Sequence, residues 1–285
     1  MAHGKTITIF WVDGNPDGIV TAKLSNWIGK GIKLPREAIE NSAKREELDA
    51  AGVYFLFCTD NEDGKDSVYI GESESLCNRL RQHILDRKNG KENFYWETVV
   101  AFSAGKELTK TSVRYLEARC VEIANTSIRY KVLTQKKAKS MPISEQEKAS
   151  MDEFLEYMKT LLVALGYRVL EPVEIPRQLS NSNRDDSNIL LFEMKEARGT
   201  GFLTMDNKFV LQAGSKLSKD TVKSCPETAI KIRKKLEEEG KISNLTLVED
   251  VVFNSSSLAG AFLLGGSISG PQHWKTSDGT CLKDL

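Results

Sequence analysis

A single carboxylate interrupts the apolar face of the helix that the sequence predicts over residues 111–124. Apolar residues recur there at helical spacing, and Glu117 lies among them, four residues after Val113. A carboxylate directed toward a protein core is unfavourable unless it is paired, hydrogen-bonded or bound to a cation. Two interpretations follow: Glu117 pairs at the edge of the stripe with Arg114 or Arg119, or it binds a metal ion.

A second group of side chains that could do chemistry lies earlier in the chain. Tyr54 and Tyr69 fall on two neighbouring predicted strands, and the helix that follows Gly71 carries Arg79 and His83. Arg79 and His83 are four residues apart and so share one helix face. Taken singly, each has an ordinary structural explanation, because tyrosines pack in sheets, glycines turn and arginines are usually solvated.

Taken together, the order and spacing of these residues resemble the GIY-YIG nuclease family, and the resemblance covers roughly residues 50–135. Valine in place of the first isoleucine is a change that the family commonly shows. The motif positions in chain order are Gly52-Val53-Tyr54, Tyr69-Ile70-Gly71, Arg79, His83 and Glu117.

The resemblance implies a catalytic role for five residues. In this family a tyrosine acts as general base or positions the water, so Tyr54 and Tyr69 would handle the attacking water. Arg79 would contact the scissile phosphate, and His83 would assist proton transfer or phosphate binding. Glu117 would bind a single Mg²⁺ or Mn²⁺, and a lone carboxylate suits Mg²⁺, which keeps several water ligands. A phenol with a pKa of ~10 is a poor base, so Arg79, His83 or the metal must lower that pKa.

DNA is the partner that the resemblance implies. The expected substrate contacts are Gly71, Arg81, Arg87, Lys88 and Asn125, of which the last lies one turn from the place of an asparagine that the family often has. The chain carries 40 Lys and Arg against 40 Asp and Glu, so its formal charge is zero. A local basic patch, rather than a bulk positive field, must therefore hold the polyanion.

These observations favour a metal-dependent endonuclease that hydrolyses DNA phosphodiester bonds. The alternative is a catalytically inactive nucleic-acid-binding module, a decayed nuclease in a restriction, repair or defence system. Glu72 favours the alternative, because many relatives have lysine or a small residue there and an acid would lie close to the DNA phosphates. A protein that binds other proteins is a third, remote reading. The oligomeric state and the preferred DNA substrate stay open.

The elements that must position these residues predict a small α/β domain with a mixed or antiparallel sheet. Ser73 is expected to cap the helix that carries Arg79, and a solvated helix is expected from Pro35 to about Asp49. The order strand, strand, helix, strand, helix indicates an α+β fold. The predicted ranges are an N-terminal hairpin at 6–12 and 19–21, buried central strands at 53–57 and 67–70, a strand at 96–102, and helices at 111–124 and 144–165.

Composition divides the chain into three parts: a nuclease domain at 1–140, a helix and polar linker at 141–189, and a small α+β domain at 190–285. Trp274 and Phe253 in the last part are expected in a core. The predicted elements there are strands at 192–197, 202–205 and 209–213 and helices at 227–239 and 256–264.

The last part resembles an uncharacterised bacterial domain that often follows GIY-YIG domains. It is also similar to small domains attached to restriction and methylation enzymes, which implies recognition of DNA or of a partner. The segments that carry this resemblance include 199–202, 209–215, 252–259 and 270–275.

The remaining composition predicts a cytoplasmic protein. The longest apolar stretches are far shorter than the ~18 residues of a membrane span, and the N-terminus has no apolar core of a signal peptide. Five cysteines without a C-x-x-C pair are expected to be reduced thiols, mostly in the core.

Overall fold

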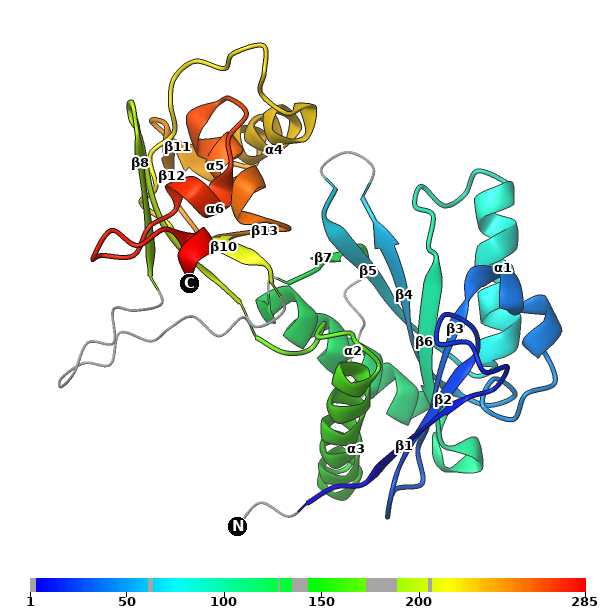
Figure 1. Ribbon diagram of the computed structural model, residues 1–285. Coiled ribbons are helices and arrows are strands. Elements are labelled where there is room, and N and C mark those ends of the chain that lie inside the picture. Colours follow the sequence, from blue (N-terminus) through cyan, green and yellow to red (C-terminus); the bar gives the residue numbers. More distant parts are fainter. Residues whose placement is uncertain (1–3, 61–63, 128, 135–142, 173–188, 205–206) are drawn as a thin grey trace. The chain divides into compact units, whose positions relative to one another are not determined.

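The computed structural model describes residues 4–60, 64–127, 129–134, 143–172, 189–204 and 207–285 (Figure 1). The chain forms two compact units. The N-terminal unit comprises Met1–Asp60 and Asp66–Pro172, and the C-terminal unit comprises Asn61–Lys65 and Val173–Leu285. Each unit combines a sheet with helices, which confirms the predicted α+β class. Among the described residues, the longest helices are too polar or too short to cross a bilayer.

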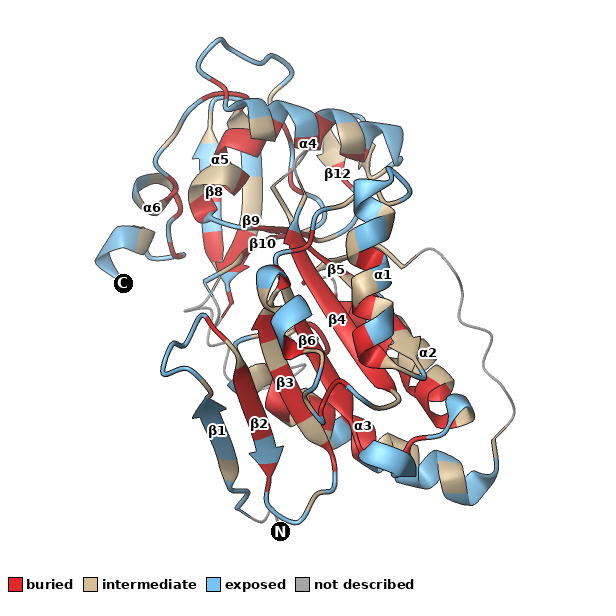
Figure 2. Ribbon diagram, turned by 90° about the vertical axis from the view of Figure 1, so that its right-hand side faces the viewer, coloured by how far each residue is buried: buried red, intermediate tan, exposed pale blue. Residues whose placement is uncertain are grey.

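A seven-stranded sheet forms the framework of the N-terminal unit, in the order β1-β2-β3-β6-β4-β5-β7. All neighbours pair antiparallel except β5 and β7. Strand β4 lies inside the sheet, so a nearly continuous apolar run forms it, whereas the edge strand β1 is exposed (Figure 2). The strands are β1 Ile7–Trp11, β2 Val20–Leu24, β3 Lys30–Pro35, β4 Gly52–Thr59, β5 Asp66–Ser73, β6 Thr98–Ser103 and β7 Lys131–Val132.

Helices cover both faces of this sheet (Figure 1). Helix α1 (Leu76–Lys88) packs on the face that Tyr54, Leu56 and Cys58 of β4 present, called here the α1 face. Helices α2 (Lys110–Ser127) and α3 (Glu145–Ala164) pack on the opposite face, the α2 face. Because side chains alternate along a strand, successive residues of β4 enter two separate cores.

The predicted first hairpin is confirmed as β1 and β2, but the helix expected from Pro35 to Asp49 is wrong. Strand β3 runs to Pro35, and two short 3₁₀ helices follow, Arg36–Ala38 and Glu40–Ser42. Ile32 and Leu34 alternate with polar residues and are fully buried between β2 and β6. In the segment that follows, Ile39 and Leu48 are fully buried in the core of the α1 face and the Arg36 amide donates to the Glu97 carbonyl, so tertiary contacts prevail over helix-favouring composition.

Two smaller expectations about the second hairpin are also corrected. Ser75, not Ser73, is the residue before α1, and the Ser73 hydroxyl instead accepts a hydrogen bond from the Ser75 amide. Strand β5 is less central than expected, because β7 pairs with only Ser67 and Val68 of it.

Helix α3 contributes to the core of the N-terminal unit. The Ser144 hydroxyl caps it by accepting from the Glu147 amide. Its buried face packs on the α2 face through Phe154, Leu155, Met158, Leu161 and Leu162. The expected linker falls largely on residues 173–188, which lie outside the described part.

The C-terminal unit contains a four-stranded antiparallel sheet in the order β13-β10-β9-β8 and a two-stranded sheet of β11 and β12. The predicted helices at 227–239 and 256–264 are confirmed. The elements are β8 Leu190–Met194, β9 Ala197–Leu203, β10 Phe209–Leu211, α4 Glu227–Glu238, β11 Ile242–Ser243, β12 Thr246–Leu247, β13 Val251–Phe253, α5 Ser256–Leu264 and α6 Gly270–His273.

Aromatic packing builds the centre of this second core. Trp274 is fully buried against Phe192 and Phe209, and its indole N–H donates to the Ser256 carbonyl. Phe253 is buried as well, so the expected core roles are confirmed. The predicted strand at 192–197 is wrong at its end, because the β8–β9 turn has a positive φ of 55° at Lys195.

A buried arginine closes the C-terminal end of α5. Arg233 donates from Nε to the Phe262 carbonyl at 2.6 Å and from Nη2 to the Leu263 carbonyl at 2.8 Å. A third bond reaches the Ser218 carbonyl. The Phe262 and Leu263 carbonyls have no partner within their own helix; the guanidinium bonds both, and the Ser218 amide also donates to Leu263.

Replacing Arg233 with methionine is expected to lower the free energy of unfolding of the C-terminal unit by roughly 1–3 kcal/mol, because the Phe262 carbonyl loses its hydrogen-bond donor. Thermal unfolding checks this, with the exposed Lys234→Ala on the same helix as control. Equal stability of the two variants would contradict the capping role.

Candidate active site

The hydroxyl of Tyr54 lies between two side chains of α1. Tyr54 is 1% exposed, and its Oη lies 2.8 Å from His83 Nε2 and accepts from Arg79 Nε at 3.2 Å. Both partners reach it because they lie one turn apart on the helix face that packs on β4. The structure therefore brings together three residues that the motif spacing singled out.

Tyr69 lies beside this group on the neighbouring strand. In the register of β4 and β5, Tyr54 faces Gly71 and Leu56 faces Tyr69, so the two tyrosines are diagonal neighbours on the α1 face. Their rings stack with centroids 6.3 Å apart, and the Tyr69 ring meets His83 edge-on at 5.1 Å.

Gly71 leaves room for the ring of Tyr54. A Cβ atom at Gly71 would lie 2.4 Å from Tyr54 Oη and 2.5 Å from its Cζ. The Tyr54 side chain thus crosses β5 in direct contact with its backbone, which only glycine allows. The structure places Gly71 beside the expected catalytic groups and gives it this packing role.

Burial prevents Tyr54 from being a standing phenolate. Its pKa is raised well above the ordinary value, first by burial and then by Tyr69, and these effects outweigh the opposing charge of Arg79. Arg79 lowers this pKa, as expected, but in the protein alone the loss of hydration of the anion has the larger effect.

Glu117 lies half-buried on α2, near this group. Its pKa is raised to about 7, first by burial and second by the negative charge of Glu72, whereas Arg114 and Arg79 act in the opposite direction. Glu72 itself bonds Arg114 Nε at 3.4 Å. Arg119 is directed to Glu122 and Asp152. Glu72 and Glu117 therefore repel each other, and Glu117 also acts electrostatically on Tyr54.

Glu92 is a member of the site that sequence reasoning missed. Its Oε1 contacts Nδ1 of the fully buried His83. Glu92 lies in the irregular connection between α1 and β6, where periodicity gives no signal. The aromatic run that follows it, Phe94 to Trp96, could have indicated that this connection packs on the site: Phe94 stacks on Tyr69 and Trp96 is buried.

The expected substrate-binding residues are more scattered. Arg81 bonds Glu40 and, two residues after Arg79, points to a different side of α1. Arg87 donates to the Glu92 carbonyl, and Lys88 is exposed at the helix end. Asn125 is exposed two turns beyond Glu117, and its amide donates to the Val121 carbonyl of its own helix. The fold does not bring Arg81 or Asn125 to the tyrosines.

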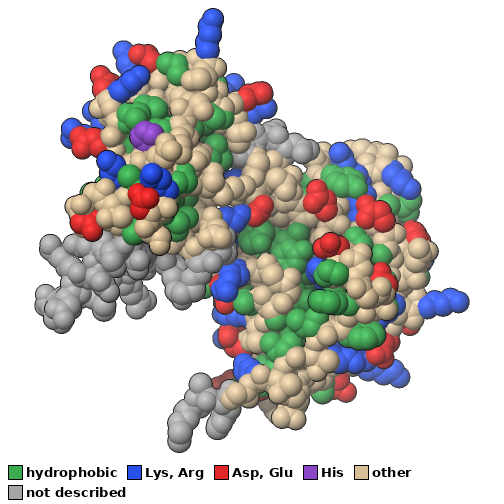
Figure 3. All heavy atoms as spheres, viewed as in Figure 1, with side chains coloured by type: hydrophobic (Ala, Val, Ile, Leu, Met, Phe, Trp, Pro, Cys, Tyr) green, Lys and Arg blue, Asp and Glu red, His purple; other side chains and the backbone are tan. Residues whose placement is uncertain are grey.

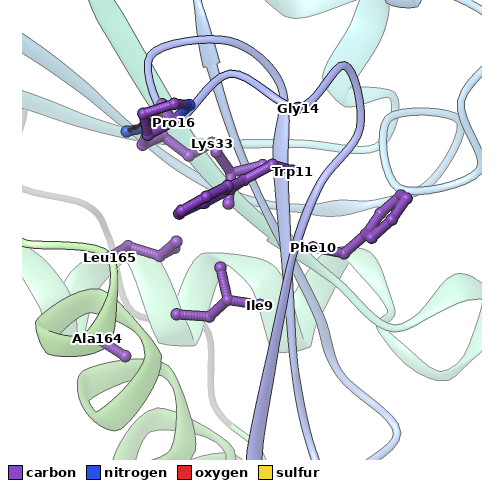
Figure 4. A pocket seen from close by; sticks show the side chains of 9 residues that line it. Ile9, Phe10, Trp11, Gly14, Pro16, Lys33, Ala164 and Leu165 are labelled. Atoms are coloured by element: carbon purple, nitrogen blue, oxygen red, sulfur yellow. Dashed lines mark hydrogen bonds between the residues drawn. The ribbon is translucent and has the colours of Figure 1, made fainter.

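A shallow pocket of about 580 Å³ lies elsewhere on the N-terminal unit, between the first hairpin and the end of α3 (Figure 4). Ile9, Trp11 and Leu165 line it, and none of the catalytic candidates does. Acidic and basic side chains are interspersed over the visible face of each unit, as the balanced composition requires (Figure 3).

Comparison with known families finds one match, at the C-terminal end of the chain. Residues 190–285 match a family described as a domain of unknown function, DUF4357. No GIY-YIG family model matches the N-terminal region. No curated protein and no solved structure matches the chain. The comparisons therefore support the resemblance of the last part to an uncharacterised domain.

Gly71→Ala is expected to lower the free energy of unfolding of the N-terminal unit by about 1–3 kcal/mol, because the new methyl group overlaps the Tyr54 ring. Chemical denaturation checks this. Gly4→Ala is the matched control, since a Cβ there meets no atom within 4 Å. Equal effects of the two substitutions would contradict the packing role of Gly71.

Glu117→Gln is expected to stabilise the metal-free protein above pH 7. A carboxyl whose pKa is raised on folding opposes folding as it ionises, so the gain is absent below the ordinary pKa of about 4.5 and complete above about 7. Allowing for solvent screening, the gain is on the order of 1 kcal/mol. Thermal unfolding with EDTA at pH 4.5 and 8 measures it, and a pH-independent difference would contradict this.

Proposed function

We propose that the protein is a metal-dependent endonuclease that hydrolyses DNA phosphodiester bonds by a GIY-YIG-type, single-metal mechanism. One observation carries the proposal: the buried Tyr54 hydroxyl is held between Arg79 and His83, beside Tyr69. Glu117 lies near enough to influence the pKa of Tyr54. A buried hydroxyl needs hydrogen-bond partners in any fold, but the partners here are an arginine and a histidine with a second tyrosine beside them, the types of side chain that phosphodiester hydrolysis requires.

Hydrolysis needs an aligned water, a proton acceptor and charge stabilisation at the phosphoryl oxygens. Tyr54 would orient the water and take its proton, passing its own to His83, because a phenol with a raised pKa cannot act as a standing base. Arg79 uses Nε on Tyr54 and keeps guanidinium donors for a phosphate oxygen.

The residues present fit a divalent cation. Glu117 is a half-buried carboxylate whose ionisation is disfavoured by burial and by Glu72, and a cation would supply the missing countercharge. Among the described residues there is no group of three His, Cys, Asp or Glu that would enclose a metal. One carboxylate ligand, with water filling the other positions, is typical of Mg²⁺, and Mn²⁺ accepts the same oxygen ligands. When bound, the ion polarises a phosphoryl oxygen.

DNA contact would come from the basic end of α1, where Arg87 and Lys88 lie, with Arg81 as a further contact if DNA displaces Glu40. The C-terminal unit would recognise DNA or a partner. All five cysteines are free thiols, as expected in the reducing cytoplasm where we place the protein.

One observation favours the alternative of an inactive nucleic-acid-binding module. Glu72 lies beside Glu117 and adds to the negative charge there, which opposes approach of a phosphate. Its bond to Arg114 offsets part of that charge. The same cation that serves catalysis would offset the remainder, so the nuclease is the proposal that explains more of the site.

Wild-type protein is expected to nick supercoiled plasmid with Mg²⁺ or Mn²⁺ and not with EDTA. Glu117→Ala and Tyr54→Phe are each expected to lower the cleavage rate by roughly 10²–10⁴-fold while DNA binding persists, since they remove the metal ligand and the proton carrier. Glu122→Ala, an exposed carboxylate on the same helix as Glu117, is the matched control.

Unchanged cleavage by Glu117→Ala would reject the single-metal mechanism. Salt-sensitive DNA binding without cleavage of plain, branched or modified DNA would instead select the binding module.

A further inference from the structure

We propose that Glu92 is a positioning residue that fixes the tautomer of His83, so that Nε2 of His83 is free to accept the proton of Tyr54. This inference rests on the proposed nuclease function and adds to it a residue that the GIY-YIG resemblance does not assign. Contacts join the three side chains in series, from Glu92 through His83 to Tyr54.

Both ring nitrogens of His83 have partners, and His83 is completely buried. Nδ1 contacts Glu92 Oε1, and Nε2 lies 2.8 Å from Tyr54 Oη. An ionised carboxylate only accepts hydrogen bonds, so the ring proton belongs on Nδ1. Nε2 then carries the lone pair, and the Tyr54 hydroxyl donates to it while accepting from Arg79 Nε.

A second buried charged group, Arg36, interacts electrostatically with Glu92. The Arg36 guanidinium lies over the Trp96 ring at 4.6 Å and over the Tyr95 ring at 4.9 Å. Glu92 is among the groups that act electrostatically on it. Glu92 Oε2 and Arg36 Nη1 are both buried and, within the described part of the chain, make no hydrogen bond. The Glu92 carboxylate thus contacts the His83 imidazole through Oε1 and acts electrostatically on the Arg36 guanidinium.

Charged and titratable groups reach His83 from each element packed around it. The sheet supplies two phenols, α1 supplies two arginines, and the irregular segments supply the carboxylate and the buried guanidinium. These groups are Tyr54, Tyr69, Arg79, Arg87, Glu92 and Arg36. Glu92 is the one that contacts Nδ1, so it decides which nitrogen carries the proton.

One proton moves from the attacking water through Tyr54 to His83 as the phosphodiester bond is exchanged. The water oxygen forms a bond to phosphorus, one water proton passes to Tyr54 Oη, and the Tyr54 proton passes to His83 Nε2. The leaving oxygen departs with the electron pair of its broken bond to phosphorus and takes a proton from solvent. The resulting imidazolium is stabilised by Glu92 and returns its extra proton to solvent through Tyr54.

The tautomer can be measured without any cleavage assay. The chain has three histidines, so long-range ¹H–¹⁵N correlation spectra are simple, and His83→Asn assigns the ring. At pH 8 the wild type is expected to show a proton on Nδ1 and none on Nε2. Glu92→Leu is expected to lose this preference, whereas Glu97→Leu, an exposed carboxylate in the same connection, is expected to retain it.

Kinetics supply the second readout. On plasmid DNA, Glu92→Leu is expected to lower kcat roughly 10–100-fold with little change in KM, as for other residues that orient a reacting group. Glu92→Gln keeps an acceptor oxygen and is expected to recover part of the rate. Circular dichroism of each variant establishes that it is folded.

The tautomer measurement and the cleavage kinetics distinguish failure of the Glu92 role from failure of the proposed nuclease function. A wild-type ring protonated on Nε2, or a Glu92→Leu ring still protonated only on Nδ1, would overturn the role of Glu92 whether or not DNA is cleaved. Absence of cleavage with the expected tautomers would reject the nuclease and retain Glu92 as the group that sets the His83 tautomer. Cleavage with an unchanged kcat in Glu92→Leu would overturn the proposal.

Discussion

The N-terminal unit is organised around the burial of one phenol hydroxyl. A hydroxyl without water must find hydrogen-bond partners inside the protein, and Tyr54 finds them in Arg79 and His83. This requirement fixes the rotation of α1 on the sheet, because both residues must face β4. It also determines that Gly71 has no side chain, since the ring crosses β5 there. The hydrogen bonds that allow Tyr54 Oη to be buried are therefore the same ones that the proposed chemistry uses.

Local patterns in the sequence predicted the strands and helices that carry the site residues. A short, nearly all-apolar run revealed β4, and the four-residue spacing of Arg79 and His83 placed them on one face of α1. Glu117 was singled out because a carboxylate among the apolar positions of α2 is unfavourable. Its half-buried position and raised pKa agree with that expectation.

The sequence failed where tertiary pairing outweighs local preference. The segment after Pro35 has helix-favouring composition, yet it forms only two short 3₁₀ helices where strand β3 leaves the sheet. Glu92 lies in a connection without periodicity, and its partner is nine residues away across a loop. Arg79 lowers the pKa of Tyr54 as expected, but the loss of hydration on burial, which spacing along the chain does not reveal, raises it by more. Each failure concerns a quantity that depends on the folded surroundings.

The hydrophobic cores of the N-terminal unit share no buried residue with those of the C-terminal unit. Trp96 is fully buried in the N-terminal unit and Trp274 in the C-terminal unit. Each unit therefore carries its own intrinsic fluorophore at the centre of its own packing. Melting of the whole chain should be treated as two transitions with separate enthalpies rather than as a single two-state equilibrium.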